Sequence, residues 1–179
     1  MKYSIEWLLA NHNDTTEYLC FWGHTPSKDG SITKTCFSQW WESPFTVEGK
    51  IYKTAEHWMM VGKAQLFGDF DIIEDILNAE KPAVAKALGR KVRNFDEGVW
   101  NERRFDIVVQ GNVHKFAQNP KLKAFLMATK GKVIVEASPM DRIWGIGFGP
   151  ENPKATQPWA WRGQNLLGFA LMEARDLLE

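Results

Sequence analysis

The strongest constraint on the fold of this 179-residue chain is a succession of helix start and stop signals between Thr54 and Gly131. Thr54 is a good N-cap for a helix that runs to about Phe67, and Glu56 stands in its first turn, where the helix dipole favours a carboxylate. Further helices are predicted over residues 71–79, from Pro82 to Gly89, from the cap Asp96 through Phe116, from Pro120 to a stop at Gly131, and over about 164–178.

Short β-strands are predicted on either side of this helical region. They cover Tyr18–Trp22, Thr35–Trp41, Phe45–Val47 with a hairpin tip at 48–50 leading into 51–53, and Lys132–Ala137. We therefore expect a mainly α fold: a single compact helical domain over residues 1–179 with a small β element.

Charge and cysteine content narrow the function classes. The chain has 22 basic and 22 acidic residues, so the basic excess of a protein that grips nucleic acid through its phosphates is absent. Cys20 and Cys36 are too few for a disulfide scaffold; they are reduced thiols or form one bridge, and thiols are favoured. The apolar run at residues 1–10 is broken by Glu6, and no segment has the roughly 20 apolar residues of a membrane span. A cytoplasmic protein with no membrane partner is expected.

Glu56 and Lys63 are the first candidates for chemistry, because their spacing of seven places them on one face of the same helix. A carboxylate and an ammonium beside a pocket suit acid/base work, and a lysine can attack a sugar aldehyde carbon. The alternative is a helix-start glutamate and a solvated lysine, which the spacing alone favours.

A second candidate is the glycine-rich loop over residues 138–149. Asp141 can hold ribose hydroxyls or orient water, and Trp144 can stack on a base; equally, Asp141 can cap a tight loop around a buried indole. The loop lacks the dinucleotide-binding glycine pattern and the phosphate-binding P-loop. Trp100, which precedes Arg103 and Arg104, either clamps a phosphorylated nucleotide or belongs to the core. The four histidines have no metal-binding spacing, so we expect neither a metal nor a cofactor.

An ordered series of motifs spans residues 19–178 and resembles the NADAR (YbiA-like) family of N-glycosidases. It comprises Phe21-Trp22, Phe37-Ser38, the hairpin at 47–52, Thr54-Ala55-Glu56-His57-Trp58, Lys63-Ala64, Gly89-Arg90, Trp100 with Arg104, Lys115-Phe116, Leu126 to Thr129, Glu136, Asp141 with Trp144-Gly145-Ile146-Gly147, and residues 163–168. Each motif is weak by itself, whereas the ordered set is specific.

The resemblance implies a mainly helical, metal-independent enzyme that hydrolyses an N-glycosidic bond to ribose. Two substrate classes follow from it: ADP-ribose attached to guanine, free or in nucleic acid, and phosphoribosylamino-pyrimidine intermediates of riboflavin synthesis. The alternative is a module that binds ADP-ribose or a nucleotide without cleaving it. The sequence identifies no toxin partner.

The resemblance also assigns residues. It implies that Glu56, Asp141 and Lys63 are catalytic, and that the substrate lies between the aromatic N-terminal segment, the Glu56 helix and the Asp141 loop. Gln39 stands where the family usually has Asn, and Met60 where it often has Gln, and both positions bear on substrate choice. The residues expected to bind substrate are Ser38, Gln39, Trp40, Arg90, Trp100, Arg104, Trp144, Gly145, Gly147 and Asn165.

Nine tryptophans are more than a core of this size needs, so some are expected to line the site. Trp100 and Trp144 are the site candidates, and Trp40 and Trp58 are expected to form pocket walls. The others are expected to be packing residues or loop anchors: Trp7, Trp22, Trp41, Trp159 and Trp161.

Overall fold

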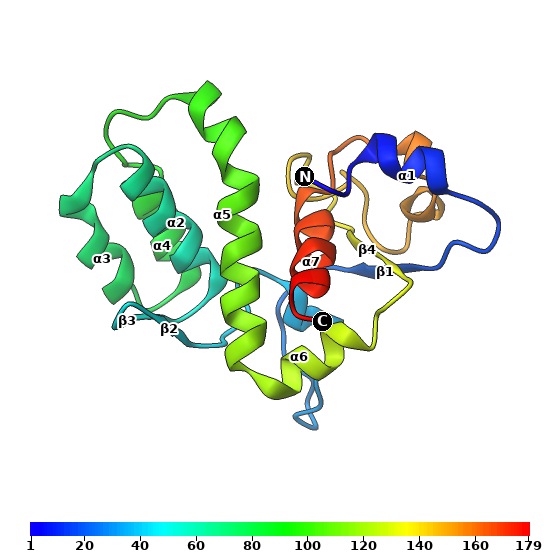
Figure 1. Cartoon of the computed structure of the whole chain (residues 1–179), viewed down its shortest axis with the longest axis horizontal. Coiled ribbons are helices and arrows are strands. Elements are labelled where there is room, and N and C mark those ends of the chain that lie inside the picture. Colours follow the sequence, from blue (N-terminus) through cyan, green and yellow to red (C-terminus); the bar gives the residue numbers. More distant parts are fainter. The chain divides into compact units, whose positions relative to one another are not determined.

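The computed structural model describes residues 1–179, and the fold is mainly helical with small sheets, as the sequence predicts. The chain forms seven α-helices and four short strands, and the strands pair in two two-stranded sheets (Figure 1). The chain divides into two compact units: unit 1 comprises residues 1–38 and 120–179, and unit 2 comprises residues 39–119. The single domain expected over residues 1–179 stays a prediction.

Unit 2 is continuous in sequence and carries four of the helices. They are α2 (Ala55–Leu66), α3 (Ile73–Asn78, after a 3-10 turn over Phe70–Ile72), α4 (Pro82–Gly89) and α5 (Glu97–Gln118). Helix α2 packs against both α4 and α5. Glycines allow these close approaches: a Cβ added at Gly89 would lie 2.0 Å from Met60 Sδ, and one added at Gly111 would lie 2.4 Å from Trp58 Cδ1.

The hairpin of unit 2 leads into α2. Strands β2 (Phe45–Val47) and β3 (Lys50–Tyr52) pair antiparallel, with Phe45 opposite Tyr52. Glu48 and Gly49 form the two-residue turn, and both have positive φ, 50° and 76°. This conformation matches the right-handed twist of the strands, and it explains the glycine at the second position.

Unit 1 is built around a parallel pair of strands, one from each of its two sequence segments. Strand β1 (Tyr18–Phe21) pairs with β4 (Val133–Glu136), with Tyr18 opposite Val133, and α7 (Leu166–Leu177) packs against β4. Helices α1 (Ile5–Asn11) and α6 (Pro120–Met127) and three 3-10 turns, Lys34–Phe37, Pro153–Thr156 and Pro158–Ala160, complete the unit. None of the helices of either unit is long and apolar enough to cross a lipid bilayer.

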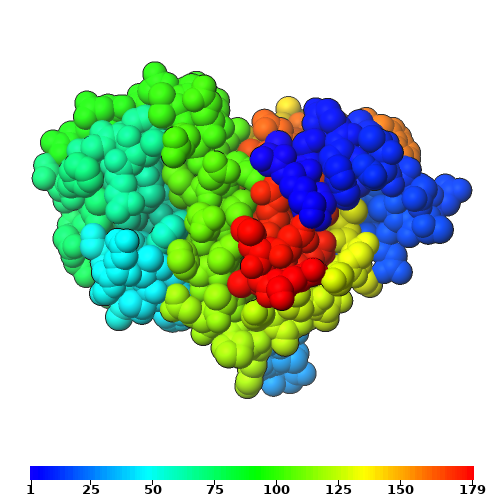
Figure 2. Space-filling model, in the orientation of Figure 1, coloured from blue at the N-terminus to red at the C-terminus, as the bar shows by residue number.

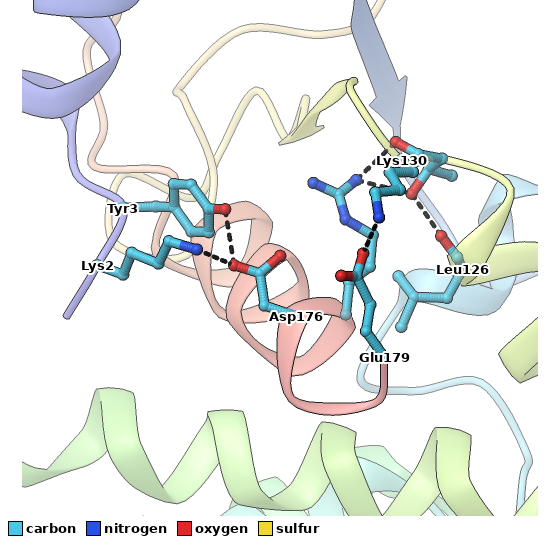
Figure 3. Close-up of polar contacts among 8 residues, drawn as sticks. Lys2, Tyr3, Leu126, Lys130, Asp176 and Glu179 are labelled. Carbon is cyan, nitrogen blue, oxygen red and sulfur yellow. Dashed lines mark hydrogen bonds and ion pairs between the residues drawn. The ribbon is translucent and has the colours of Figure 1, made fainter.

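The first residues of the chain are bonded to α7, and Figure 2 shows them (blue) against that helix (red). Lys2 Nζ lies 2.5 Å and Tyr3 Oη 2.7 Å from Asp176 Oδ2 (Figure 3), and the Glu173 carboxylate accepts the backbone N–H of Lys2. Between these two acidic residues of α7, the guanidinium of Arg175 donates to the carbonyl of Thr129 at 2.6 Å.

One expectation about local structure is wrong, and one helix was missed. Thr35–Trp41 is not a strand, because residues 34–37 form a 3-10 turn in which the neighbours Cys36 and Phe37 are both buried. Successive side chains of a strand point to opposite faces, whereas a tight turn allows both to enter the core, where the Phe37 ring meets that of Phe21. Helix α1, which begins after the N-cap Ser4, was not predicted.

Candidate active site

The start of α2 holds Glu56 in a buried position. Glu56 is 3% exposed, and its backbone N–H donates to the carbonyl of Gln39 at 3.0 Å. Thr54 caps the helix, because its hydroxyl accepts the backbone N–H of His57. The carboxylate therefore stands at the positive end of the helix dipole, as the sequence predicts, in a place shielded from water.

His57 fixes this helix start, and sequence reasoning gave it no role. Its Nε2 lies 3.1 Å from the carbonyl of Ala79, which can only accept, so Nε2 carries the proton and donates. Nδ1 then accepts from the Thr54 hydroxyl at 2.8 Å. Burial lowers the pKa of His57, and the charge of Lys53, which itself donates to the Ala79 carbonyl at 2.8 Å, lowers it further. The neutral ring thus links the cap of α2 to the end of α3.

Gln39 is joined to a second buried amide that sequence reasoning missed. Asn112, on α5, is fully buried; its Nδ2 donates to Gln39 Oε1 at 3.1 Å and to the carbonyl of Val108 at 2.9 Å. Gln39 Nε2 and Asn112 Oδ1 are buried and have no hydrogen-bond partner. The side chain of Gln39 is therefore held by α5, and the backbone carbonyl of Gln39 accepts the backbone N–H of Glu56.

Lys63 lies two turns beyond Glu56 in a partly aromatic surrounding. Its Nζ donates to the carbonyl of Gly89 at 2.9 Å, and it lies 4.1 Å from the centre of the Phe95 ring and 5.8 Å from that of Trp100. Burial lowers the pKa of the Lys63 ammonium, and the positive charge of Arg90 lowers it further. The lysine is therefore not the solvated surface residue that the spacing alone favours.

Three other candidates also lie in unit 2. Arg104 is buried on α5, one turn after Trp100, so the two side chains share a helix face. Arg90 is exposed at the end of α4, and Trp40 is half-buried, with Lys86 Nζ 5.8 Å from its ring centre. With Glu56 and Lys63, this unit brings together a buried carboxylate, a lysine with a lowered pKa, indoles and guanidinium groups.

The Asp141 loop lies in unit 1. Asp141 Oδ1 accepts the backbone N–H groups of Ile143 and Trp144, each at 2.8 Å. One carboxylate oxygen thus shapes the loop, as the loop-cap alternative expects, and the half-buried Trp144 adjoins it. Ser38, the last residue of the first segment of unit 1, ends the 3-10 turn over Lys34–Phe37.

Gly145, Gly147 and Asn165, which are expected to bind substrate, lie close to other backbone segments of unit 1. A Cβ at Gly145 would lie 2.9 Å from the carbonyl of Glu136, and Gly147 has a φ of +72°. Asn165 is fully buried; its Oδ1 accepts the backbone N–H of Glu136 at 2.9 Å, and its Nδ2 donates to the carbonyl of Ile134 at 3.0 Å. These residues shape the loop and bond the edge of β4.

Two of the tryptophans expected to pack or to anchor loops are exposed, and one of those expected to form a pocket wall packs between helices. Trp22, which follows the last residue of β1, is 54% exposed, so packing is the wrong role for it. Trp58 packs between α2 and α5, with its Nε1 donating to the carbonyl of Ile107 at 2.8 Å. Trp159 is also exposed, although its ring edge meets His12.

Comparison with known proteins places the chain in a family. Residues 20–179 match the family model of the NADAR domain. This chain belongs to the NADAR family.

The NADAR relatives include enzymes. The protein is 41% identical over 168 residues to an N-glycosidase of Acanthamoeba polyphaga mimivirus, an alignment that covers 91% of this chain and 97% of the relative. It is 31% identical over 142 residues to the N-glycosidase YbiA of Escherichia coli, covering 79% and 78% of the two chains. The NMR structure of YbiA matches with a TM-score of 0.70 at 28% identity, over 93% of this chain and 88% of that one.

Two positions at which this NADAR protein departs from the expected pattern are both buried. Gln39 is 8% exposed and Met60 6%. Met60 fills the contact of α2 with α4 at Gly89, whereas Gln39 stands next to Glu56 in the hydrogen-bond network. Of the two departures, Gln39 is the one whose backbone carbonyl is hydrogen-bonded to the candidate catalytic residue.

Proposed function

We propose that this protein is an N-glycosidase that hydrolyses an N-glycosidic bond to ribose. The observation that carries the proposal is the arrangement on α2, where a buried Glu56 shares a helix face with Lys63, whose pKa is lowered by burial and by Arg90. Its NADAR membership and its relatives named as N-glycosidases support the same chemistry.

In the proposed reaction, the bond between ribose C1′ and nitrogen breaks, and its electron pair leaves with the nitrogen. The buried carboxylate of Glu56 stabilises the positive charge that develops on the sugar and assists proton transfer. The leaving nitrogen gains a proton, and water supplies the oxygen that bonds to C1′. Asp141 is proposed to hold ribose hydroxyls or the attacking water through its second carboxylate oxygen.

Lys63 has two proposed roles. It either binds a phosphate of the substrate, or its neutral amine attacks C1′ of the ring-opened sugar, the nitrogen of the base leaves with a proton, and water hydrolyses the resulting Schiff base. The variant Lys63→Arg keeps the charge and cannot form a Schiff base. Borohydride reduction during turnover, followed by mass spectrometry, separates the roles, because only the Schiff base is trapped on Lys63.

Two substrate classes suit this site. Trp100 and Trp144 are proposed to stack on base or sugar, and Arg90 and Arg104 to bind phosphate. One class is ADP-ribose linked to guanine, including guanine in nucleic acid; the other is a phosphoribosylamino-pyrimidine. A relative in maize, 35% identical over 110 residues that make up 59% of this chain and 16% of that protein, is named a riboflavin biosynthesis protein.

The cytoplasm is the proposed location. Neither Cys20 nor Cys36 takes part in a disulfide, and Cys36 is buried. Thiols of this kind suit a reducing compartment.

The test is release of free base from ADP-ribosylated guanosine and from a phosphoribosylamino-pyrimidine, followed by chromatography. The variant Glu56→Gln is expected to lose activity by at least about a hundredfold, since it removes the charge that stabilises the transition state. Glu102→Gln, on the exposed face of α5, is the matched control and is expected to retain it. If Glu56→Gln keeps near-wild-type turnover on both substrates, the assignment fails. Binding by the wild type without turnover on either would instead identify a non-catalytic ADP-ribose-binding module.

A further inference from the structure

Phe95 is a large apolar residue that remains 45% exposed beside a functional candidate. It lies between α4 and α5, and its ring centre is 4.1 Å from Lys63 Nζ and 5.3 Å from the ring centre of Phe67. One face of the Phe95 ring therefore meets the Lys63 ammonium. Neither the proposed mechanism nor the sequence motifs give this ring a role.

An ion pair between the buried Asp69 and the exposed Arg93 holds the segment that carries Phe95. Asp69 is 2% exposed, and its carboxylate accepts the backbone N–H of Arg93 at 2.8 Å and the side-chain Nε at 2.9 Å. Asn94 follows with a φ of +57°, a left-handed conformation that asparagine adopts more readily than most residues. These two constraints set the direction of the chain just before Phe95, so the ring is placed rather than loosely attached.

The ammonium of Lys63 has few contacts that stabilise its charge, and the Phe95 ring is one of them. Its contacts are one carbonyl, that of Gly89, and the rings of Phe95 and Trp100, with no carboxylate among them. Of the two rings, Phe95 is the nearer by 1.7 Å (5.8 − 4.1). An aromatic face attracts a cation through its quadrupole, and the attraction falls with distance.

We propose that Phe95 is a positioning residue for Lys63: its ring, held by the Asp69–Arg93 pair, keeps the ammonium at the Gly89 carbonyl and stabilises the charged form in a partly desolvated place. The proposal rests on the proposed function, in which Lys63 takes part. It adds a residue that sets the balance between the charged lysine, which binds phosphate, and the neutral amine, which attacks carbon.

The test measures the titration of Lys63 directly, without substrate. Full-length protein is modified at a series of pH values with a limiting amount of an amine-reactive reagent, and Lys63 is followed by peptide mass spectrometry, with the exposed Lys91 as internal reference. The variants are Phe95→Leu, which keeps an apolar side chain but removes the ring, and Phe95→Tyr, which keeps the ring. The midpoint of the labelling profile reports the protonation of the lysine, whereas a change of access alone alters the plateau.

For Phe95→Leu we expect the Lys63 midpoint to fall by about half a pH unit, the size of one cation–π contact at an exposed site. Phe95→Tyr is expected to keep the wild-type midpoint, and Lys91 is expected to be unchanged in all three proteins. An unchanged or raised midpoint in Phe95→Leu would overturn the proposal. Because labelling needs no turnover, this outcome is independent of whether the protein cleaves either ribosyl substrate.

Discussion

At the scale of single residues, polar side chains bonded to the backbone hold the parts of the candidate site. Thr54 and His57 fix the turn that carries Glu56, and Asn112 holds Gln39. These bonds are buried, so removing one partner leaves the other without water to replace it.

Arg90→Gln is expected to move the pH dependence of kcat/KM. Burial lowers the pKa of Lys63 and Arg90 lowers it further, so removing this positive charge raises the pKa of the lysine toward its ordinary value. If the neutral amine is the active form, the limb of the profile that rises with pH moves to higher pH. Lys91→Gln removes a neighbouring exposed charge and serves as the control. A limb at the same pH in Arg90→Gln as in the wild type would exclude this electrostatic link.

His57 is expected to make the protein less stable in acid. Its folded-state pKa lies below the ordinary 6.5, so the unfolded chain binds the proton more readily than the folded one. This contribution to stability is fully present above pH 6.5 and is lost as the pH falls toward the folded-state pKa. Urea unfolding at pH 8 and pH 5 should show a smaller difference between the two pH values for His57→Gln than for the wild type. An equal difference in both proteins would assign the acid sensitivity to other groups.

Helical spacing predicted which residues share a helix face, whereas their catalytic roles come from the family resemblance and stay predictions. Glu56 and Lys63 share a face because seven residues make about two turns. Phe95 and Asp69 were missed because their contacts join the segment before α5 to α2 and to the loop after it, and no periodicity records such a contact. Asn112 was missed because a single amide on a helix is usually read as exposed.

At the scale of elements, the helices with clear N-terminal signals were predicted well. The segment 35–41, which pairs with no strand, and the short helix α1 were predicted poorly. Thr54, Pro82 and Asp96 mark the starts of α2, α4 and α5, and each is an N-cap or first helical residue. By contrast, a strand exists only where another strand pairs with it, which the pattern of 35–41 cannot reveal. Helix α1 buries only Leu8, so its apolar face gives little periodic signal.

A residue larger than glycine at position 89 is expected to clash with α2 where α2 packs against α4. A Cβ there would lie 2.0 Å from Met60 Sδ and 3.2 Å from Met60 Cβ, so Gly89→Ala is expected to destabilise the protein by about 1–3 kcal/mol. The measurement is urea unfolding of Gly89→Ala, Met60→Ala and the double variant. The double variant is expected to lose less than the sum of the two single changes. Additive losses would mean that the two side chains do not compete for the same space.

At the scale of the whole molecule, the family match spans both units, since it covers residues 20–179. The charge balance predicted a protein without an extended nucleic-acid surface, but the division into two units could not be read from composition. The pairing of β1 with β4 depends on register between distant segments, which no local pattern records. Lys2 and Tyr3, which precede the residues of the family match, are hydrogen-bonded to Asp176 of α7.

Deleting residues 1–4 is expected to loosen α7. Burial raises the pKa of Asp176, but hydrogen bonds from Lys2 and Tyr3 outweigh it and hold the pKa below its ordinary value, so the deletion removes stabilising contacts to a charged group. Hydrogen exchange of α7 amides is expected to accelerate on the order of tenfold, while α2 serves as reference. The variant Asp176→Asn should reproduce the direction of the change. Unchanged exchange in α7 would show that the N-terminal contacts add no local stability.

The order of the units along the chain has a consequence for synthesis. Residues 39–119 leave the ribosome as one stretch, whereas β1 must wait for residues 133–136 before its partner strand exists. We therefore expect the segment with Glu56 and Lys63 to acquire structure on the nascent chain first, with Tyr18–Phe21 as an unpaired strand edge until residues 133–136 have left the ribosome.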